Sequence, residues 1–173
     1  MSRKQYPDDE LIDFAERAIE YEVRMLVHDA ASLHELRPDG YLGGGMPDHK
    51  WDAVLEAWLV HLRLLDDFLE KGQSHHGAAI ARDWHDLWRS DGFLDEDVRD
   101  AVNDQLMHLS WRRLRWTEDT RPPWEHRFVE ITDACCKELI RFFGEVRPAL
   151  QPVFETPRRF AQSWLDTRKP PRP

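Results

Sequence analysis

The residues with the clearest chemical potential are a histidine, an aspartate and a tryptophan spaced along one predicted helix. Within residues 95–116, Asp104 and Trp111 stand four residues before and three after His108. At about 100° per residue, the three side chains share a face that lies opposite the apolar stripe of that helix. A carboxylate beside an imidazole can orient it, as the partner of a general base does. This face is therefore a candidate catalytic site, with Asn103 at its edge, and a solvated face or a packing surface is the alternative.

Aromatic and arginine side chains alternate directly after this histidine, in residues 111–116 (WRRLRW). The pattern suits single-stranded nucleic acid, because bases stack on indoles and guanidinium groups meet phosphates. It also suits a protein interface, where Trp and Arg are enriched, and simple matching of positive charge to a helix C-terminus. We expect Trp111, Arg112 and Arg115 to lie in an interface, and we expect this helix to contribute contacts to a homodimer.

Residues 103–110 (NDQLMHLS) resemble the RNA-cleaving helix of HEPN domains. Together with residues 61–68, they also resemble a group of uncharacterised bacterial helical proteins. HEPN domains are helical bundles, often dimeric, that occur in toxin–antitoxin and defence systems. The resemblance implies an all-α dimer in which His108, with Asp104 and Asn103 beside it, would cleave RNA.

The chain departs from the HEPN motif at its arginine, which should stand a few residues before His108. The permitted positions hold Ala101, Val102 and Asn103, and Arg99 lies one turn too early. The leading hypothesis is therefore a non-catalytic module that binds itself or a protein partner. A HEPN-like ribonuclease, or a degenerate relative of one, is the alternative, and only that alternative makes RNA a partner.

A second set of metal-capable side chains lies between two predicted helices: His75, His76, Asp83 and His85. Their spacing matches no structural zinc pattern. A metal-binding helical bundle is therefore the second alternative function, and we predict no metal site and no cofactor. The chain also lacks the glycine-rich nucleotide loops and the hydrolase and metalloprotease motifs.

Composition favours a soluble protein of the cell interior. Of the 173 residues, 41% are hydrophobic and 33% charged, and the net charge of −9 repels nucleic acid except at local basic patches. No apolar run approaches the ~20 residues of a transmembrane helix, and the basic N-terminus lacks the apolar stretch of a secretory signal. Cys135 and Cys136 are adjacent, which disfavours a disulfide between them. We expect reduced thiols, at least one of them buried, and a cytoplasmic location.

Helical periodicity and its breakers predict the scaffold, an all-α antiparallel bundle. The main helices are expected near residues 8–36, 48–70, 95–116 and 124–146, with a short extra helix near 79–88. Residues 1–150 form the bundle domain, and residues 151–173 form a basic, proline-rich tail that can dock a short helix. The predicted core includes Trp58, Leu65, Leu106, Leu139 and Phe142.

Two polar features of the 48–70 helix receive structural interpretations. His61 shares the apolar face with Trp58 and Leu65, which is typical of a hydrogen-bonded core histidine. Arg63 and Asp67 are separated by four residues, and this spacing predicts an ion pair along the helix surface.

Overall fold

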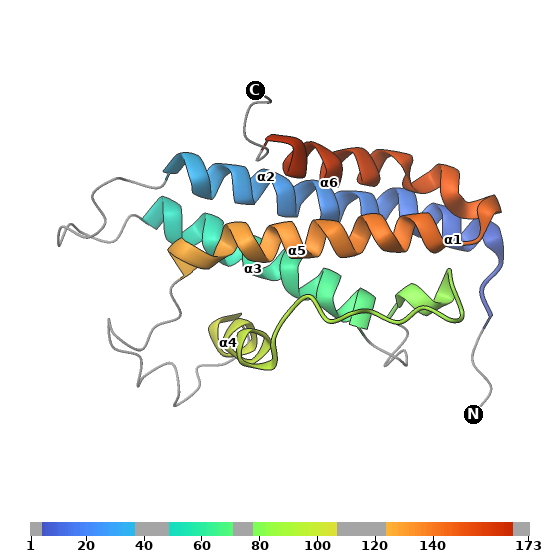
Figure 1. Cartoon of the computed structure of the whole chain (residues 1–173), viewed down its shortest axis with the longest axis horizontal. Coiled ribbons are helices and arrows are strands. Elements are labelled where there is room, and N and C mark those ends of the chain that lie inside the picture. Colours follow the sequence, from blue (N-terminus) through green and yellow to red (C-terminus); the bar gives the residue numbers. More distant parts are fainter. Residues whose placement is uncertain (1–4, 37–48, 71–77, 107–123, 168–173) are drawn as a thin grey trace, which may run out of the picture.

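The computed structural model describes residues 5–36, 49–70, 78–106 and 124–167, and over these ranges it contains helices and no strand (Figure 1). The predicted all-α class is confirmed. The first predicted helix is a continuous rod made of α1 (Asp8–Phe14), a π-helical turn (Ala15–Ile19) and α2 (Glu20–Leu36). It begins after Pro7 with three acidic residues in its first turn, which suit the positive end of the helix dipole.

The other predicted helices also appear close to their expected bounds. They are α3 (His49–Glu70), α4 (Glu96–Leu106) and α5 (Trp124–Glu145). Residues 107–116, the remainder of the predicted third helix, lie outside the described residues. The predicted short helix near 79–88 is a single 3-10 turn at Ala81–Asp83.

The C-terminal tail supplies a further long element of the bundle. A 3-10 helix (Pro148–Phe154) leads into α6 (Glu155–Thr167), which packs against α2 and α5. Its Trp164 is buried and donates a hydrogen bond from Nε1 to Asp133 Oδ1 on α5 at 2.6 Å. The docking helix expected in the tail is therefore present and fixed by a buried indole.

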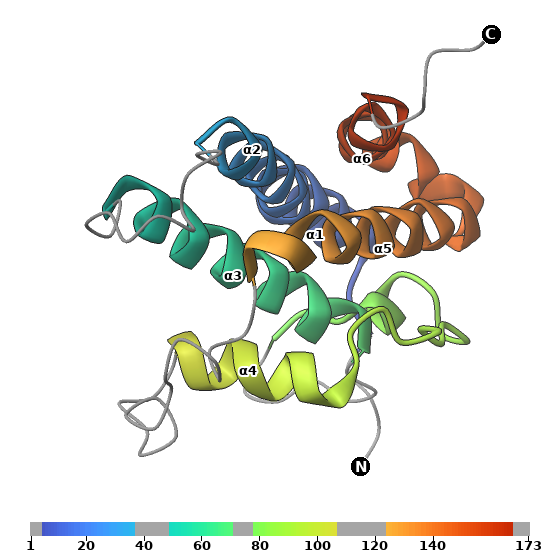
Figure 2. The same ribbon diagram turned by 60° about the vertical axis from the view of Figure 1, so that its left-hand side comes forward.

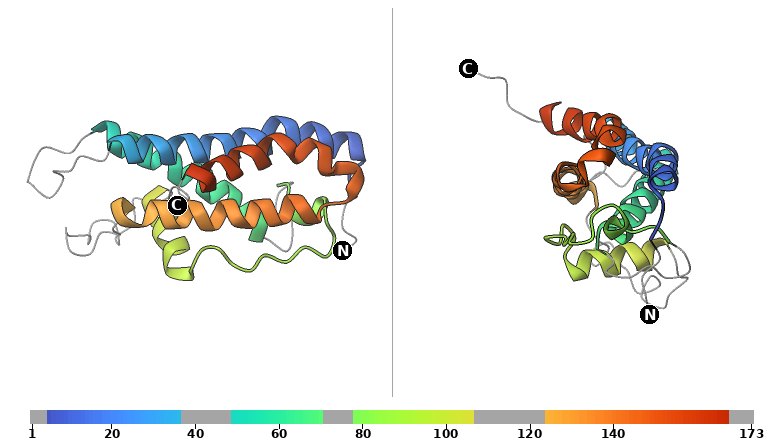
Figure 3. Two further views of the ribbon diagram at one scale, coloured as in Figure 1. Left: turned by 45° about the horizontal axis from the view of Figure 1, so that its top comes forward. Right: turned by 90° about the vertical axis from the view of Figure 1, so that its right-hand side faces the viewer.

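The long helices α2, α3, α5 and α6 lie side by side around one core, as the view along the bundle shows (Figure 3, right). Helix α4 lies outside this group and packs against α3 (Figure 2). Helix α3 therefore contacts α2 along one side and α4 along another.

Four of the five predicted core residues are buried, and the fifth is not. Trp58, Leu65, Leu139 and Phe142 are at most 2% exposed, whereas Leu106 is only partly buried. The prediction that Leu106 is buried was wrong. Helix α4 lies on the outside of the bundle, and only the inner edge of α4 meets the core. That edge is formed by Val98 and Val102, which are 3% and 1% exposed.

We expect Leu106→Ala to lower the free energy of unfolding by only about 1 kcal/mol, because a partly buried side chain leaves little cavity. Leu139→Ala, at a fully buried position of α5, should cost about 2–5 kcal/mol. Urea denaturation of the two variants measures both losses. Equal losses would contradict the placement of α4 at the edge of the core.

Candidate functional site

The predicted catalytic face lies only in part within the described residues. Asn103 and Asp104 stand near the end of α4, and both are half-buried. The side-chain oxygen of Asn103 is buried and has no hydrogen-bond partner among the described residues. His108 and the predicted interface residues Trp111, Arg112 and Arg115 lie outside the described residues, so their roles stay predictions.

The histidine-rich connection is likewise described in part. His75 and His76 lie outside the described residues, while Asp83 and His85 have separate contacts. Asp83 Oδ2 accepts a hydrogen bond from the Ile80 amide at 3.0 Å, and His85 Nε2 lies 3.8 Å from Glu145 Oε2 on α5. In the parts of the chain that the structure describes, no three metal-capable side chains come together.

Arg99, which stands one turn before the expected motif position, is held by a buried carboxylate. Its Nε and Nη2 donate to the two oxygens of Asp66 on α3 at 2.7 and 2.8 Å. The Asp66 side chain is 2% exposed. The hydrogen bond to Asp66 raises the pKa of Arg99, against the opposing effect of burial. This bidentate pair links α4 to α3 and gives Arg99 a structural role.

His61 lies between two carboxylates of α2. Its Nδ1 is 2.6 Å from Glu22 Oε2, and its Nε2 is 3.7 Å from Asp29 Oδ2. His61 is 9% exposed, which confirms its interpretation as a hydrogen-bonded core histidine. Glu22 and Asp29 were not predicted as its partners. Their spacing of seven residues, two turns of a helix, places both on the side of α2 that faces α3.

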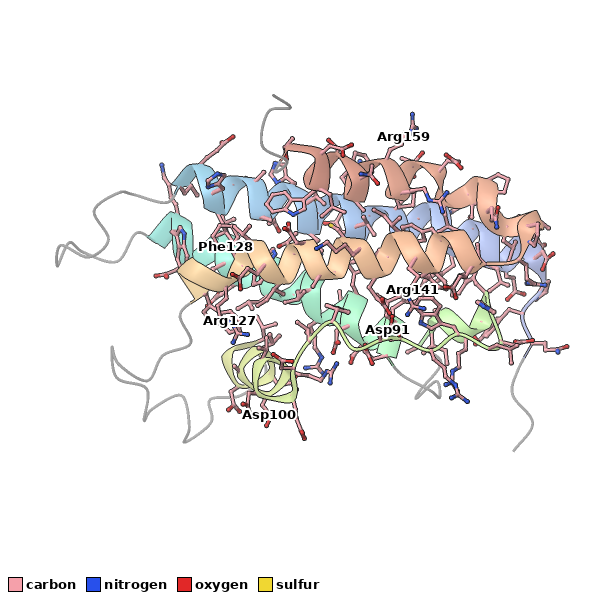
Figure 4. All side chains as sticks on the ribbon, viewed as in Figure 1. Asp91, Asp100, Arg127, Phe128, Arg141 and Arg159 are labelled. Atoms are coloured by element: carbon pink, nitrogen blue, oxygen red, sulfur yellow. The ribbon has the colours of Figure 1, made fainter. Side chains whose placement is uncertain are left out.

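A third buried carboxylate joins α5 to the segment before α4. Glu138 accepts hydrogen bonds from Ser90 Oγ, from the Asp91 amide and from Arg141. Burial raises the pKa of Glu138, but these bonds together lower it below its usual range. The Arg141 guanidinium also lies 4.2 Å from the Trp88 ring centroid and points toward Asp91 (Figure 4).

Both cysteines are buried and free, on the inner side of α5. Burial raises the pKa of Cys136 to about 12 and raises that of Cys135 well above its usual value. The thiolate form of cysteine is the one that acts as a nucleophile or metal ligand. Because their raised pKa values keep both thiols protonated, Cys135 and Cys136 act as core side chains.

An exposed apolar surface includes side chains of α1, α2 and α3. We define it by four large side chains that are 41–46% exposed: Phe14, Tyr21, Val60 and Leu64. Phe14 and Leu64 line a common cavity of about 300 Å³, and the Tyr21 ring lies 5.8 Å from the His61 ring. Val60 and Leu64 are neighbours one turn apart on α3. This surface was not predicted, because the sequence pattern of a helix that is apolar on most of its circumference indicates burial.

The chemical roles of these groups follow from their contacts. Asp66, Glu138 and His61 each have a polar or oppositely charged partner inside the protein, which is typical of groups that hold helices together. The apolar surface, by contrast, faces solvent. None of the described helices has the combination of length and apolar composition that crossing a membrane requires. No protein-family model, curated protein or solved structure matches this chain.

Proposed function

We propose that this chain is a non-catalytic cytoplasmic helical module that binds a second protein surface, its own or a partner's, through the apolar surface of α1–α3. The observation that supports the proposal is the exposure of Phe14, Tyr21, Val60 and Leu64, of which Phe14 and Leu64 line one cavity. Single exposed apolar side chains are ordinary on protein surfaces, whereas a contiguous group marks an interaction site.

The shape of this surface supports the same proposal. The cavity between Phe14 and Leu64 has mainly apolar walls and gives a protruding side chain of a partner a place to bury. Interfaces draw most of their binding energy from a few aromatic or aliphatic side chains seated in such hollows.

The non-catalytic part of the proposal rests on Arg99. The HEPN motif needs an arginine free to act near the histidine, and the nearest candidate here is bound on two nitrogens by the buried Asp66. A guanidinium held in this way links α4 to α3 and is not free to act in catalysis.

The proposal predicts that the wild-type chain self-associates at tens of micromolar, as measured by light scattering, and that a Val60→Gln/Leu64→Gln variant loses this self-association. Each exposed apolar side chain buried at an interface contributes about 1 kcal/mol, and a symmetric dimer buries two copies of each, so the dissociation constant should rise at least about a hundredfold. Leu87→Gln is the matched control, because Leu87 is 83% exposed, lies in the loop before α4 and is not one of the four residues that define this surface.

Two results would count against the proposal. A wild-type chain that stays monomeric at this concentration defeats self-association through the apolar surface. Cleavage of RNA that is lost in His108→Ala would replace the non-catalytic reading with the ribonuclease alternative.

A further inference from the structure

We infer that the partner of the apolar surface is a second copy of this chain, and that the two copies pair through antiparallel α3 helices with reciprocal Arg63–Glu56 ion pairs. This inference rests on the proposed function, because it names the partner of the same surface.

The outward arc of α3 is apolar along about three turns. Val60 and Leu64 are exposed, Ala53 is exposed, and Ala57 is half-buried. At about 100° per residue, these four positions fall within an arc of about 60°. The two alanines are small enough to let another helix approach closely, and the two larger side chains project from the same arc.

One edge of this arc carries charges of both signs. Glu56 is exposed, and Arg63 lies seven residues further along the same edge with 27% of its side chain exposed. Arg63 Nε lies 3.4 Å from Asp67 Oδ2 one turn away, which confirms the predicted ion pair and orients the guanidinium along this edge. The opposite edge of the arc holds Ala57 and turns toward α2.

If a twofold axis perpendicular to α3 relates two copies of the chain, the charged edges of their α3 helices are complementary. In an antiparallel helix pair, each edge of one helix meets the same edge of the other. With the axis near Val60, Glu56 stands opposite the partner's Arg63, and Arg63 stands opposite the partner's Glu56. Val60 then lies beside its own copy, and Leu64 packs toward the partner's Ala57.

A parallel pair would lose this complementarity. It would set the charged edge of each helix against the apolar edge of the other, where Glu56 and Arg63 meet no opposite charge. The antiparallel arrangement also aligns the two helix dipoles favourably. Phe14 and Tyr21, exposed on the neighbouring rod, extend the apolar contact on the α2 side.

The inference is tested with the full chain and four charge variants, followed by sedimentation velocity and native mass spectrometry. We expect Arg63→Glu and Glu56→Arg each to weaken the wild-type dimer at least about tenfold, because two attractions become two repulsions. The Glu56→Arg/Arg63→Glu double variant should dimerise again. An equimolar mixture of the two single variants should form a heterodimer, since one chain then carries acid and the other base at both positions.

Arg159→Glu is the matched control. Arg159 is exposed on α6 and points away from the bundle, so its charge reversal should leave the dimer unchanged (Figure 4). Circular dichroism of each variant confirms that its helices are folded before assembly is measured.

The outcomes separate this inference from the proposed function. If the single charge variants leave the dimer intact while Val60→Gln/Leu64→Gln dissociates it, the antiparallel pairing is overturned and the apolar surface remains the binding site. Failure of the mixture and the double variant to restore assembly overturns the Arg63–Glu56 pairing. A wild-type monomer overturns both the inference and the self-association on which it rests.

Discussion

Replacing Trp58 by alanine should lower the free energy of unfolding by about 3–5 kcal/mol, the largest effect that we expect from a single substitution. The side chain is fully buried in the middle of α3. Its ring packs edge-to-face on Trp124 and Phe128 of α5, at centroid distances of 6.3 and 6.4 Å. The substitution removes an indole from the contact between two long helices, and a domain of ordinary stability has only about 5–15 kcal/mol to lose. The midpoint of urea denaturation measures the loss.

Trp58→Phe is the control for this prediction, because it keeps most of the ring and removes the indole N–H. In the native protein Trp58 Nε1 donates to Thr132 Oγ1 at 3.1 Å, and that hydroxyl in turn donates to the Phe128 carbonyl. Thr132 keeps this second bond in the variant, so Trp58→Phe should cost only about 1–2 kcal/mol. Similar losses in the two variants would mean that the aromatic packing at this position contributes little.

Replacing Arg99 by methionine should destabilise the protein by about 3 kcal/mol, the second large effect. Removing one partner of a buried ion pair leaves an uncompensated charge, here the carboxylate of Asp66. We expect the lower end of the usual range, because a third of the Arg99 side chain is exposed and water can reach the space that it leaves.

A double-substitution cycle gives this prediction its control. Asp66→Leu/Arg99→Met removes both charges and keeps apolar volume at the α3–α4 contact, so it should recover most of the stability lost in Arg99→Met. A double variant that is as unstable as Arg99→Met would show that Asp66 is not the source of the loss. If Arg99→Met were neutral, the pair would contribute nothing to holding α4.

The local features of this protein were predictable from the sequence alone. Apolar periodicity and the breakers around it placed the described helix bounds of the four main predicted helices to within a few residues, because helix hydrogen bonds connect residues only four apart. The same locality explains why the Arg63–Asp67 pair, one turn along α3, was predicted correctly. The burial of His61 followed from its position on an apolar face, although its carboxylate partners did not.

The features that only the tertiary structure decided all join residues far apart in the chain. Asp66 and Arg99 are 33 residues apart and Glu22 and His61 are 39 apart, so no helical periodicity connects them. The partial exposure of Leu106 and the exposure of Val60 and Leu64 depend on which arc of a helix its neighbours cover. An apolar stripe shows that a helix packs against something, but the position of α4 on the outer side of α3 determines which part of that stripe is buried within the chain and which part faces solvent.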